Sequence, residues 1–132
     1  MSEKPKLAMY WAASCGGCEI SVLNIGDKIL VVDEIFDLAF FPCIADFKHS
    51  DVEGYPDGYI DVCLFNGAIR TSDNEEMAKL LRKKSKVLVA YGSCAYEGCI
   101  PALSNLTSKE ETFNNVYFEN QSIDNPDRVL PM

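Results

Sequence analysis

Apolar residues along this chain are concentrated in four short runs, and helical periodicity fills much of the sequence between them. Runs that are hydrophobic on both alternating faces are typical of buried parallel strands. The stretches between them carry polar residues and capping signals, which favour helices on the faces of a sheet. The predicted strands cover residues 6–12, 37–41, 59–65 and 86–91.

Helices are predicted between these strands and after the last one. The first begins near Cys18 and is broken around Gly26, and a second runs over 27–35. Ser72 and Glu75 form a capping-box pattern that opens a third helix. Further predicted features are a polar surface loop at 45–58, a helix capped by Ser108 and Glu111 that ends near Tyr117, and an exposed segment at 118–132.

Strands alternating with helices predict an α/β fold, a flavodoxin-like doubly wound parallel sheet with helices on both faces. In such sheets ligands bind beyond the carboxyl ends of the strands. Cys15 and Cys18 follow the first predicted strand, and Cys94 follows the fourth. The topology therefore brings three thiols from distant parts of the chain to one edge.

The motif Cys15-Gly-Gly-Cys18 suits an iron–sulfur cluster. Glycines let the backbone wrap closely around a bulky ligand, and a thiolate at Cys18 lies near a helix N-terminus, which favours negative charge. A CxxC motif also occurs in zinc sites and in thioredoxin-like redox pairs. Zinc would need further ligands, and the only histidine, His49, lies in the predicted surface loop. A redox pair would leave Cys94 unexplained.

The other candidate residues have ordinary structural explanations. Cys63 lies within an apolar strand and is predicted to be a core residue. For Cys43 and Cys99 we favour packing roles, with a ligand role as the alternative for Cys43 and a fourth-ligand role as the alternative for Cys99. Glu19 is expected to be a first-turn helix acid, with proton transfer as the alternative, and Asn66 part of a plain turn.

Composition and charge narrow the range of partners. The 132 residues carry a formal net charge of −8, which argues against nucleic acid or an anionic membrane as a partner. We find no run of about 20 apolar residues and no N-terminal signal pattern, so we expect a cytoplasmic protein. Six cysteines in a reducing compartment are then core thiols, ligands or a redox pair, and not a disulfide framework.

Three runs of sequence resemble the small subunits of nickel–iron hydrogenases, which are related to the 20-kDa subunit of NADH:ubiquinone oxidoreductase. They are WAASCGGCE at 11–19, DVCLFNGAIR at 61–70 and YGSCAYEGCIP at 91–101. The likeness is to the gamma-type small subunit of the viologen-reducing, deazaflavin-non-reducing hydrogenase of methanogens. It extends from the first strand to about residue 105.

This resemblance implies a proximal [4Fe–4S] cluster bound by Cys15, Cys18 and Cys94. The family's fourth ligand, in a later Gly-Cys-Pro motif, has no match here. Residues 1–105 are thus expected to form the proximal-cluster domain, and 106–132 an extension leading to a C-terminal part that would carry further clusters. The family usually has glutamate where this chain has Asn66, so no role of that glutamate is carried over.

The resemblance also implies a function and partners. The large subunit, with the nickel–iron centre, splits hydrogen, and the small subunit conducts electrons through its clusters. In the viologen-reducing type, the electrons continue through a small iron–sulfur subunit to heterodisulfide reductase. The chain itself would be an electron relay without a substrate site. A flavin-binding flavodoxin-like module and a docking module without redox function are the alternatives.

Overall fold

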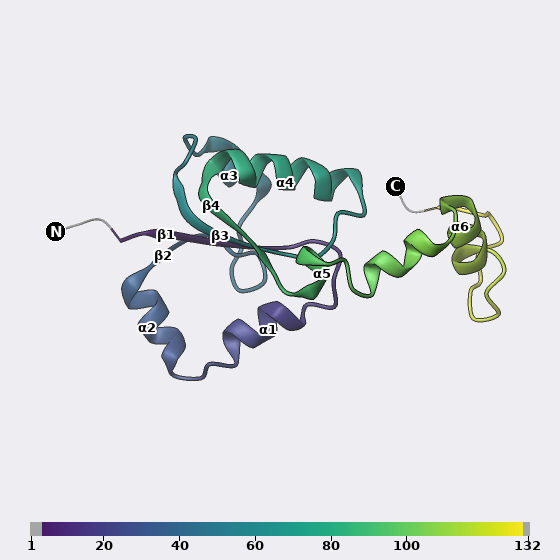
Figure 1. Cartoon of the computed structure of the whole chain (residues 1–132), viewed down its shortest axis with the longest axis horizontal. Coiled ribbons are helices and arrows are strands. Elements are labelled where there is room, and N and C mark those ends of the chain that lie inside the picture. The colour runs from purple at the N-terminus through teal and green to yellow at the C-terminus, as the bar shows by residue number, and fades with distance from the viewer. Residues whose placement is uncertain (1–3, 131–132) are drawn as a thin grey trace.

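The computed structural model, which describes residues 4–130, contains a four-stranded parallel sheet with helices on both faces (Figure 1). The strand order is β2-β1-β3-β4, which confirms the flavodoxin-like arrangement. Residues 1–3 and 131–132, the ends of the predicted terminal segments, lie outside the described part. The strands are β1 (Lys6–Trp11), β2 (Asp37–Phe40), β3 (Ile60–Asn66) and β4 (Ser85–Tyr91).

One face of the sheet carries the main hydrophobic core. It is covered by α3 (His49–Gly54) and α4 (Ser72–Lys84), which lie on the same side in Figure 1. Met77 and Leu81 of α4 pack with Phe40 and Ile60 of the strands, and all four are at most 1% exposed. Each such side chain contributes roughly 1.5–3 kcal/mol by leaving water.

The opposite face is covered more loosely by α1 (Gly17–Leu23) and α2 (Lys28–Ile35). No residue of α2 is fully buried, and Leu30, Val31 and Ile35 are exposed. The break predicted near Gly26 separates these two helices, and Gly26 has a φ of 63°.

The prediction of a surface loop at 45–58 is wrong in part, because α3 forms within this range. Asp51 accepts a hydrogen bond from the backbone N–H of Lys48 at 2.7 Å, which caps the helix, and Val52 is completely buried. One apolar anchor is enough to dock a short helix, although the surrounding composition is that of a loop. His49 is accordingly a helix residue, with Nδ1 3.9 Å from the Asp73 carboxylate.

The predicted start of the long helix is displaced by one residue. Thr71, not Ser72, is the N-cap residue, and its hydroxyl accepts a hydrogen bond from the N–H of Asn74 at 3.2 Å. The Asn74 side chain reaches back to the N–H of Thr71 at 3.3 Å. Asparagine therefore takes the place in the capping box that was predicted for Glu75.

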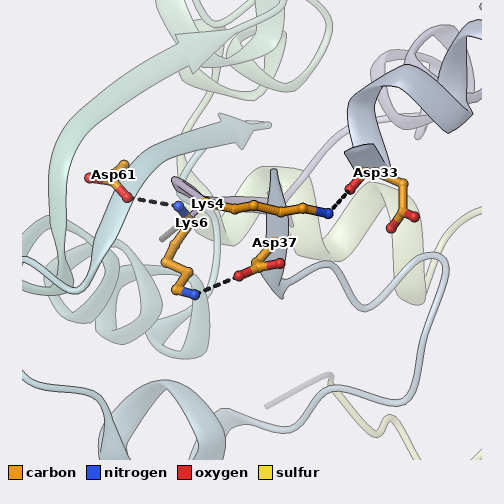
Figure 2. A network of polar contacts seen from close by, with 5 residues as sticks. All are labelled: Lys4, Lys6, Asp33, Asp37 and Asp61. Atoms are coloured by element: carbon orange, nitrogen blue, oxygen red, sulfur yellow. Dashed lines mark hydrogen bonds and ion pairs between the residues drawn. The ribbon is translucent and has the colours of Figure 1, made fainter. Parts of the chain in front are cut away.

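Charged residues are paired at the amino ends of the strands (Figure 2). The Lys6 ammonium contacts Asp37 at 2.7 Å, and its backbone N–H donates to Asp61 at 2.7 Å. The second oxygen of Asp61 accepts from Lys86 at 2.6 Å, and Lys4 donates to the carbonyl of Asp33 at 2.7 Å. We call these residues the amino edge: Lys4, Lys6, Asp37, Asp61 and Lys86.

The chain leaves the sheet after β4. It forms the short α5 (Ser93–Tyr96), a 3-10 helix η1 (Pro101–Leu106) and α6 (Lys109–Tyr117). Figure 1 shows α6 at a distance from the sheet. The predicted Ser108 cap is confirmed, since its hydroxyl accepts from the N–H of Glu111 at 3.0 Å. Within residues 4–130 there is no helix with the length and hydrophobicity that crossing a bilayer requires.

Candidate metal centre

Three strands end at the same level, so the loops that follow them meet. Trp11 of β1 is paired with Asn66 of β3, and Asn66 is paired with Tyr91 of β4. The loops after these strands contain all three predicted ligands. We call this region the cysteine edge, and it comprises residues 12–18, 66–68 and 92–99.

The first two loops are tied together through their backbones. The N–H of Ala12 donates to the carbonyl of Asn66 at 2.7 Å, and Ala13 and Ala68 exchange hydrogen bonds of 3.1 and 3.0 Å. Gly67 has a φ of 101°, and a β-carbon there would lie 2.8 Å from the Ala13 nitrogen. Only glycine permits this close approach, which fixes where the CxxC loop begins.

Trp11 supports the CxxC loop from one side. Its indole N–H donates to the carbonyl of Ser14 at 3.1 Å. The ring lies against Gly16, where an added β-carbon would be 2.7 Å from a ring carbon. Gly16 has a φ of 80°, so this turn uses both the small size of glycine and its access to the left-handed region.

The two thiols of the motif differ in their surroundings. Cys15 is exposed, and its sulfur accepts a hydrogen bond from the N–H of Gly17 at 3.4 Å. Cys18 is half-buried in the first turn of α1, as predicted. Burial raises the pKa of Cys18, and the charges of Glu19 and Cys15 raise it further. These effects oppose the thiolate stabilisation that the helix N-terminus was expected to provide.

The loop after β4 packs directly on Cys18. Gly92 has a φ of 85°, and a β-carbon there would lie 2.3 Å from the Cys18 sulfur. Gly92 caps α5, so Cys94 lies in the first turn of that helix, two residues from this contact. The structure thus brings the CxxC loop and the Cys94 loop together.

Cys94 is electrostatically linked to the other thiols of the edge. Burial raises the pKa of Cys94, followed by the charge and the hydrogen bond of Cys99. The charges of Cys15 and Cys18 raise it as well. The three predicted ligands therefore lie within electrostatic range of one another, and Cys99, for which packing was favoured, lies with them.

A buried polar pair lies behind the CxxC loop. Glu19 is 1% exposed and Asn66 is completely buried. The Asn66 amide donates to Glu19 at 2.7 Å and to the Ser14 hydroxyl at 2.8 Å. The second oxygen of Glu19 and the amide oxygen of Asn66 are buried and have no hydrogen-bond partner. Glu19 lies in the first turn of α1, as predicted, but it is buried against Asn66, which is more than a turn residue.

The remaining cysteines test the predicted packing roles. Cys63 is completely buried in the core, as predicted, and burial raises its pKa to about 12. Cys43 and Cys99 are exposed, so the packing roles expected for both are wrong. Ser93 and the backbone of Ile100 hydrogen-bond to Cys99, and these bonds lower its pKa.

The residues present fit a multi-iron cluster in three respects. The donors are cysteine thiols, and [4Fe–4S] clusters are typically held by cysteine thiolates. An N–H points at the Cys15 sulfur, and hydrogen bonds to sulfur tune such centres. The glycines leave room at the loops where a side chain would collide with Cys18 or with Trp11. Within residues 4–130 no three His, Cys, Asp or Glu side chains are close enough together to coordinate one metal ion.

Several functional features of this edge were not found from the sequence. The contact between Gly92 and Cys18 and the pairing of Glu19 with Asn66 join residues that are 74 and 47 positions apart. No local pattern reports such contacts. The proximity of Cys99 to Cys94 in the sequence was the one local sign that Cys99 lies at this edge.

Comparisons with known proteins identify a family and several relatives of the chain. Residues 15–130 match the family described as NADH ubiquinone oxidoreductase, 20 Kd subunit. The chain is 39% identical over 127 residues to an iron-sulfur subunit of the F420-non-reducing hydrogenase of Archaeoglobus profundus, covering 96% of this chain and 40% of that protein. It is 35% identical over 131 residues to a subunit of the F420-non-reducing hydrogenase of Methanothermobacter thermautotrophicus, covering 99% and 41%.

A solved structure shares the fold. A chain in the crystal structure of an NAD+-reducing [NiFe]-hydrogenase in the H2-reduced state superimposes with a TM-score of 0.80 and 25% sequence identity. The match covers 98% of this chain and 71% of that chain. The chain spans about two fifths of the length of the two curated relatives named above.

Proposed function

The chain belongs to the family of the NADH ubiquinone oxidoreductase 20 Kd subunit, and we propose that it is the electron-transfer part of a [NiFe] hydrogenase small subunit. Its likeness to subunits of F420-non-reducing hydrogenases supports a hydrogenase of that type. The observation that carries the proposal is the convergence of Cys15, Cys18 and Cys94 at one edge of the sheet.

In this proposal the three cysteines hold a proximal [4Fe–4S] cluster, which accepts and donates one electron at a time. Thiolate ligands require loss of the thiol protons, so cluster binding is favoured as pH rises. The Gly17 N–H donates to the Cys15 sulfur, and Trp11 fixes the turn that presents it. The chain supplies binding and orientation and has no substrate site of its own.

Exposed apolar residues around the cysteine edge support a protein partner there. Tyr96, Ile100 and Leu106 are 69%, 72% and 81% exposed, and Trp11 and Ile69 about half. Exposed apolar side chains that gather on one face of a protein mark interaction sites. We assign this surface to the large subunit, because electron tunnelling requires a short distance between the nickel–iron centre and the cluster.

The proposal extends to the next acceptors, which the sequence resemblance implies. Electrons would pass through further clusters and a small iron–sulfur subunit to heterodisulfide reductase, in a cytoplasmic complex. Co-purification of these subunits with the tagged chain under anaerobic conditions tests this part. Recovery of the large subunit without them would limit the proposal to the hydrogenase.

The cluster is tested by iron and sulfide analysis and by EPR of the reduced protein, purified anaerobically in its complex. Cys94→Ser is expected to remove most of the signal assigned to the proximal cluster, because one of its iron atoms loses its thiolate. Cys43→Ser is the matched control, since Cys43 is an exposed cysteine that is not among the predicted ligands. A parent protein without iron, or with a flavin released by heating in its place, would contradict the proposal.

A further inference from the structure

Asn66 is a polar residue at the buried end of a strand. It is the last residue of β3, it is completely buried, and its strand lies between β1 and β4. Its register partners are Trp11 and Tyr91, so the CxxC loop and the Gly92 loop leave the sheet on either side of it. Asparagine is uncommon in strands, and burying its amide is costly unless the amide is hydrogen-bonded. The hydrogen bonds of this side chain therefore explain its position.

The Asn66 amide is hydrogen-bonded to both ends of the CxxC motif. Its nitrogen donates to the Ser14 hydroxyl at 2.8 Å and to the Glu19 carboxylate at 2.7 Å. Ser14 directly precedes Cys15, and Glu19 directly follows Cys18. An amide nitrogen carries two hydrogens, and these two bonds use both of them. One side chain thus holds the two ends of the segment that carries two of the proposed ligands.

The orientation of this amide follows from the chemistry of its partner. A carboxylate oxygen only accepts hydrogen bonds, so the nitrogen of Asn66 faces Glu19. The amide oxygen lies towards Gly92, where an added β-carbon would be 3.4 Å from it and 2.3 Å from the Cys18 sulfur. Asn66 is therefore close to the loop that leads to Cys94 as well as to the CxxC loop.

We propose that Asn66 is a positioning residue of the cluster site, which holds the CxxC loop in its ligand-presenting form through hydrogen bonds to both ends. It binds no iron itself, and Cys15 and Cys18 remain the ligands of this loop. Ordering a loop costs conformational entropy, and a loop that is held before the cluster binds does not impose that cost on binding. This inference rests on the proposed function, because it concerns how firmly a cluster is held.

The first test measures the order of the loop without iron. The full protein is prepared in its complex and treated with a chelator, and hydrogen–deuterium exchange is followed by mass spectrometry. In Asn66→Ala the amides of residues 12–19 should exchange about tenfold faster than in the parent, the factor expected for the loss of one hydrogen bond to a charged group. Val52→Ala is the matched control, because it shortens a completely buried side chain of α3, which covers the other face of the sheet. It should lower stability and leave this exchange unchanged.

The second test measures the cluster in the complex, purified anaerobically. Asn66→Ala should release iron to a chelator about tenfold faster than the parent, for the same reason. It should also change the EPR g values of the reduced proximal cluster, because the thiolates are no longer held in one orientation. Val52→Ala should leave the release rate and the g values unchanged.

A reversed pair separates positioning from a general loss of stability. Asn66→Asp alone sets two carboxyl groups against each other and removes both N–H donors, so we expect it to behave like Asn66→Ala. When Glu19→Gln is added, the new amide at position 19 can donate to the new carboxylate at position 66, and the Ser14 hydroxyl can donate to it as well. The double variant should therefore recover most of the slow exchange and the slow iron release. It also keeps the test decisive if Asn66→Ala does not fold.

Three results would overturn the inference. Asn66→Ala could leave the exchange of residues 12–19 and the release of iron unchanged. The reversed pair could be no better than Asn66→Asp alone, or Val52→Ala could have the same effects as Asn66→Ala. Each of these leaves the proposed function intact. A parent protein without any cluster would overturn both.

Discussion

The two edges of the sheet differ in how their charged side chains are paired. At the amino edge each oxygen of Asp61 accepts one hydrogen bond, and Lys6 and Lys86 have carboxylate partners. At the cysteine edge Glu19 and Asn66 are buried with unpartnered oxygens, and thiols lie near one another. The charged groups of the amino edge have partners, whereas the cysteine edge combines thiols with a buried carboxyl, which is the chemistry of a ligand-binding site.

The strongest test of this contrast is Gly92→Ala. A methyl group there would lie 2.3 Å from the Cys18 sulfur at a φ of 85°. We expect the proximal-cluster signal to be lost and stability to fall by about 1–3 kcal/mol, because a φ of 85° with a ψ of 160° is a backbone conformation that glycine alone adopts readily. Iron analysis, EPR and urea unfolding measure these effects.

Gly26→Ala is the matched control for this change. Gly26 also has a positive φ, of 63°, but an added β-carbon there meets nothing within 4 Å. This variant should show the backbone destabilisation alone and keep its iron. Equal iron content in the Gly92 and Gly26 variants would show that the contact with Cys18 has no role in cluster binding.

A second test is Glu19→Gln, which replaces a buried carboxyl beside Cys18 with a neutral amide of the same shape. Less negative charge near the cluster favours its reduced state, so the midpoint potential should rise by on the order of tens of millivolts. Redox titration followed by EPR measures it. Glu75→Gln, on the exposed surface of α4, is the control. An unchanged potential would mean that Glu19 serves only to hold Asn66.

The smallest effect is expected at the amino edge, from Asp61→Asn. This change removes the ion pair with Lys86 and leaves an acceptor for the Lys6 N–H, so stability at pH 7 should fall by no more than about 1 kcal/mol. Cluster content should not change. A loss of iron in this variant would contradict the division between the two edges.

The same pair should respond to acid. The hydrogen bond from Lys86 and that from the Lys6 backbone lower the pKa of Asp61. A lowered folded-state pKa stabilises the protein above the unfolded value of about 3.9, and this contribution is lost as pH falls through the folded-state pKa. The stability difference between parent and Asp61→Asn should therefore shrink below about pH 4, as urea unfolding at pH 7 and pH 3 would show.

Local patterns in the sequence were enough to predict the strands, the order of the elements and the edge at which Cys15, Cys18 and Cys94 would meet. Hydrophobic runs and a CxxC motif are such patterns, and the topology of parallel sheets places the loops. Local pattern was insufficient at α3, where one buried valine outweighed a loop-like composition.

Only the tertiary structure decides which side chains surround the thiols. Burial of Glu19 against Asn66, the contact of Gly92 with Cys18 and the exposure of Cys99 depend on segments that are distant in sequence. Such contacts follow from the register of β1, β3 and β4, which ends all three strands at one level. A residue's role at this edge is set by its neighbours in space, and neighbours across a sheet leave no periodic signal in the sequence.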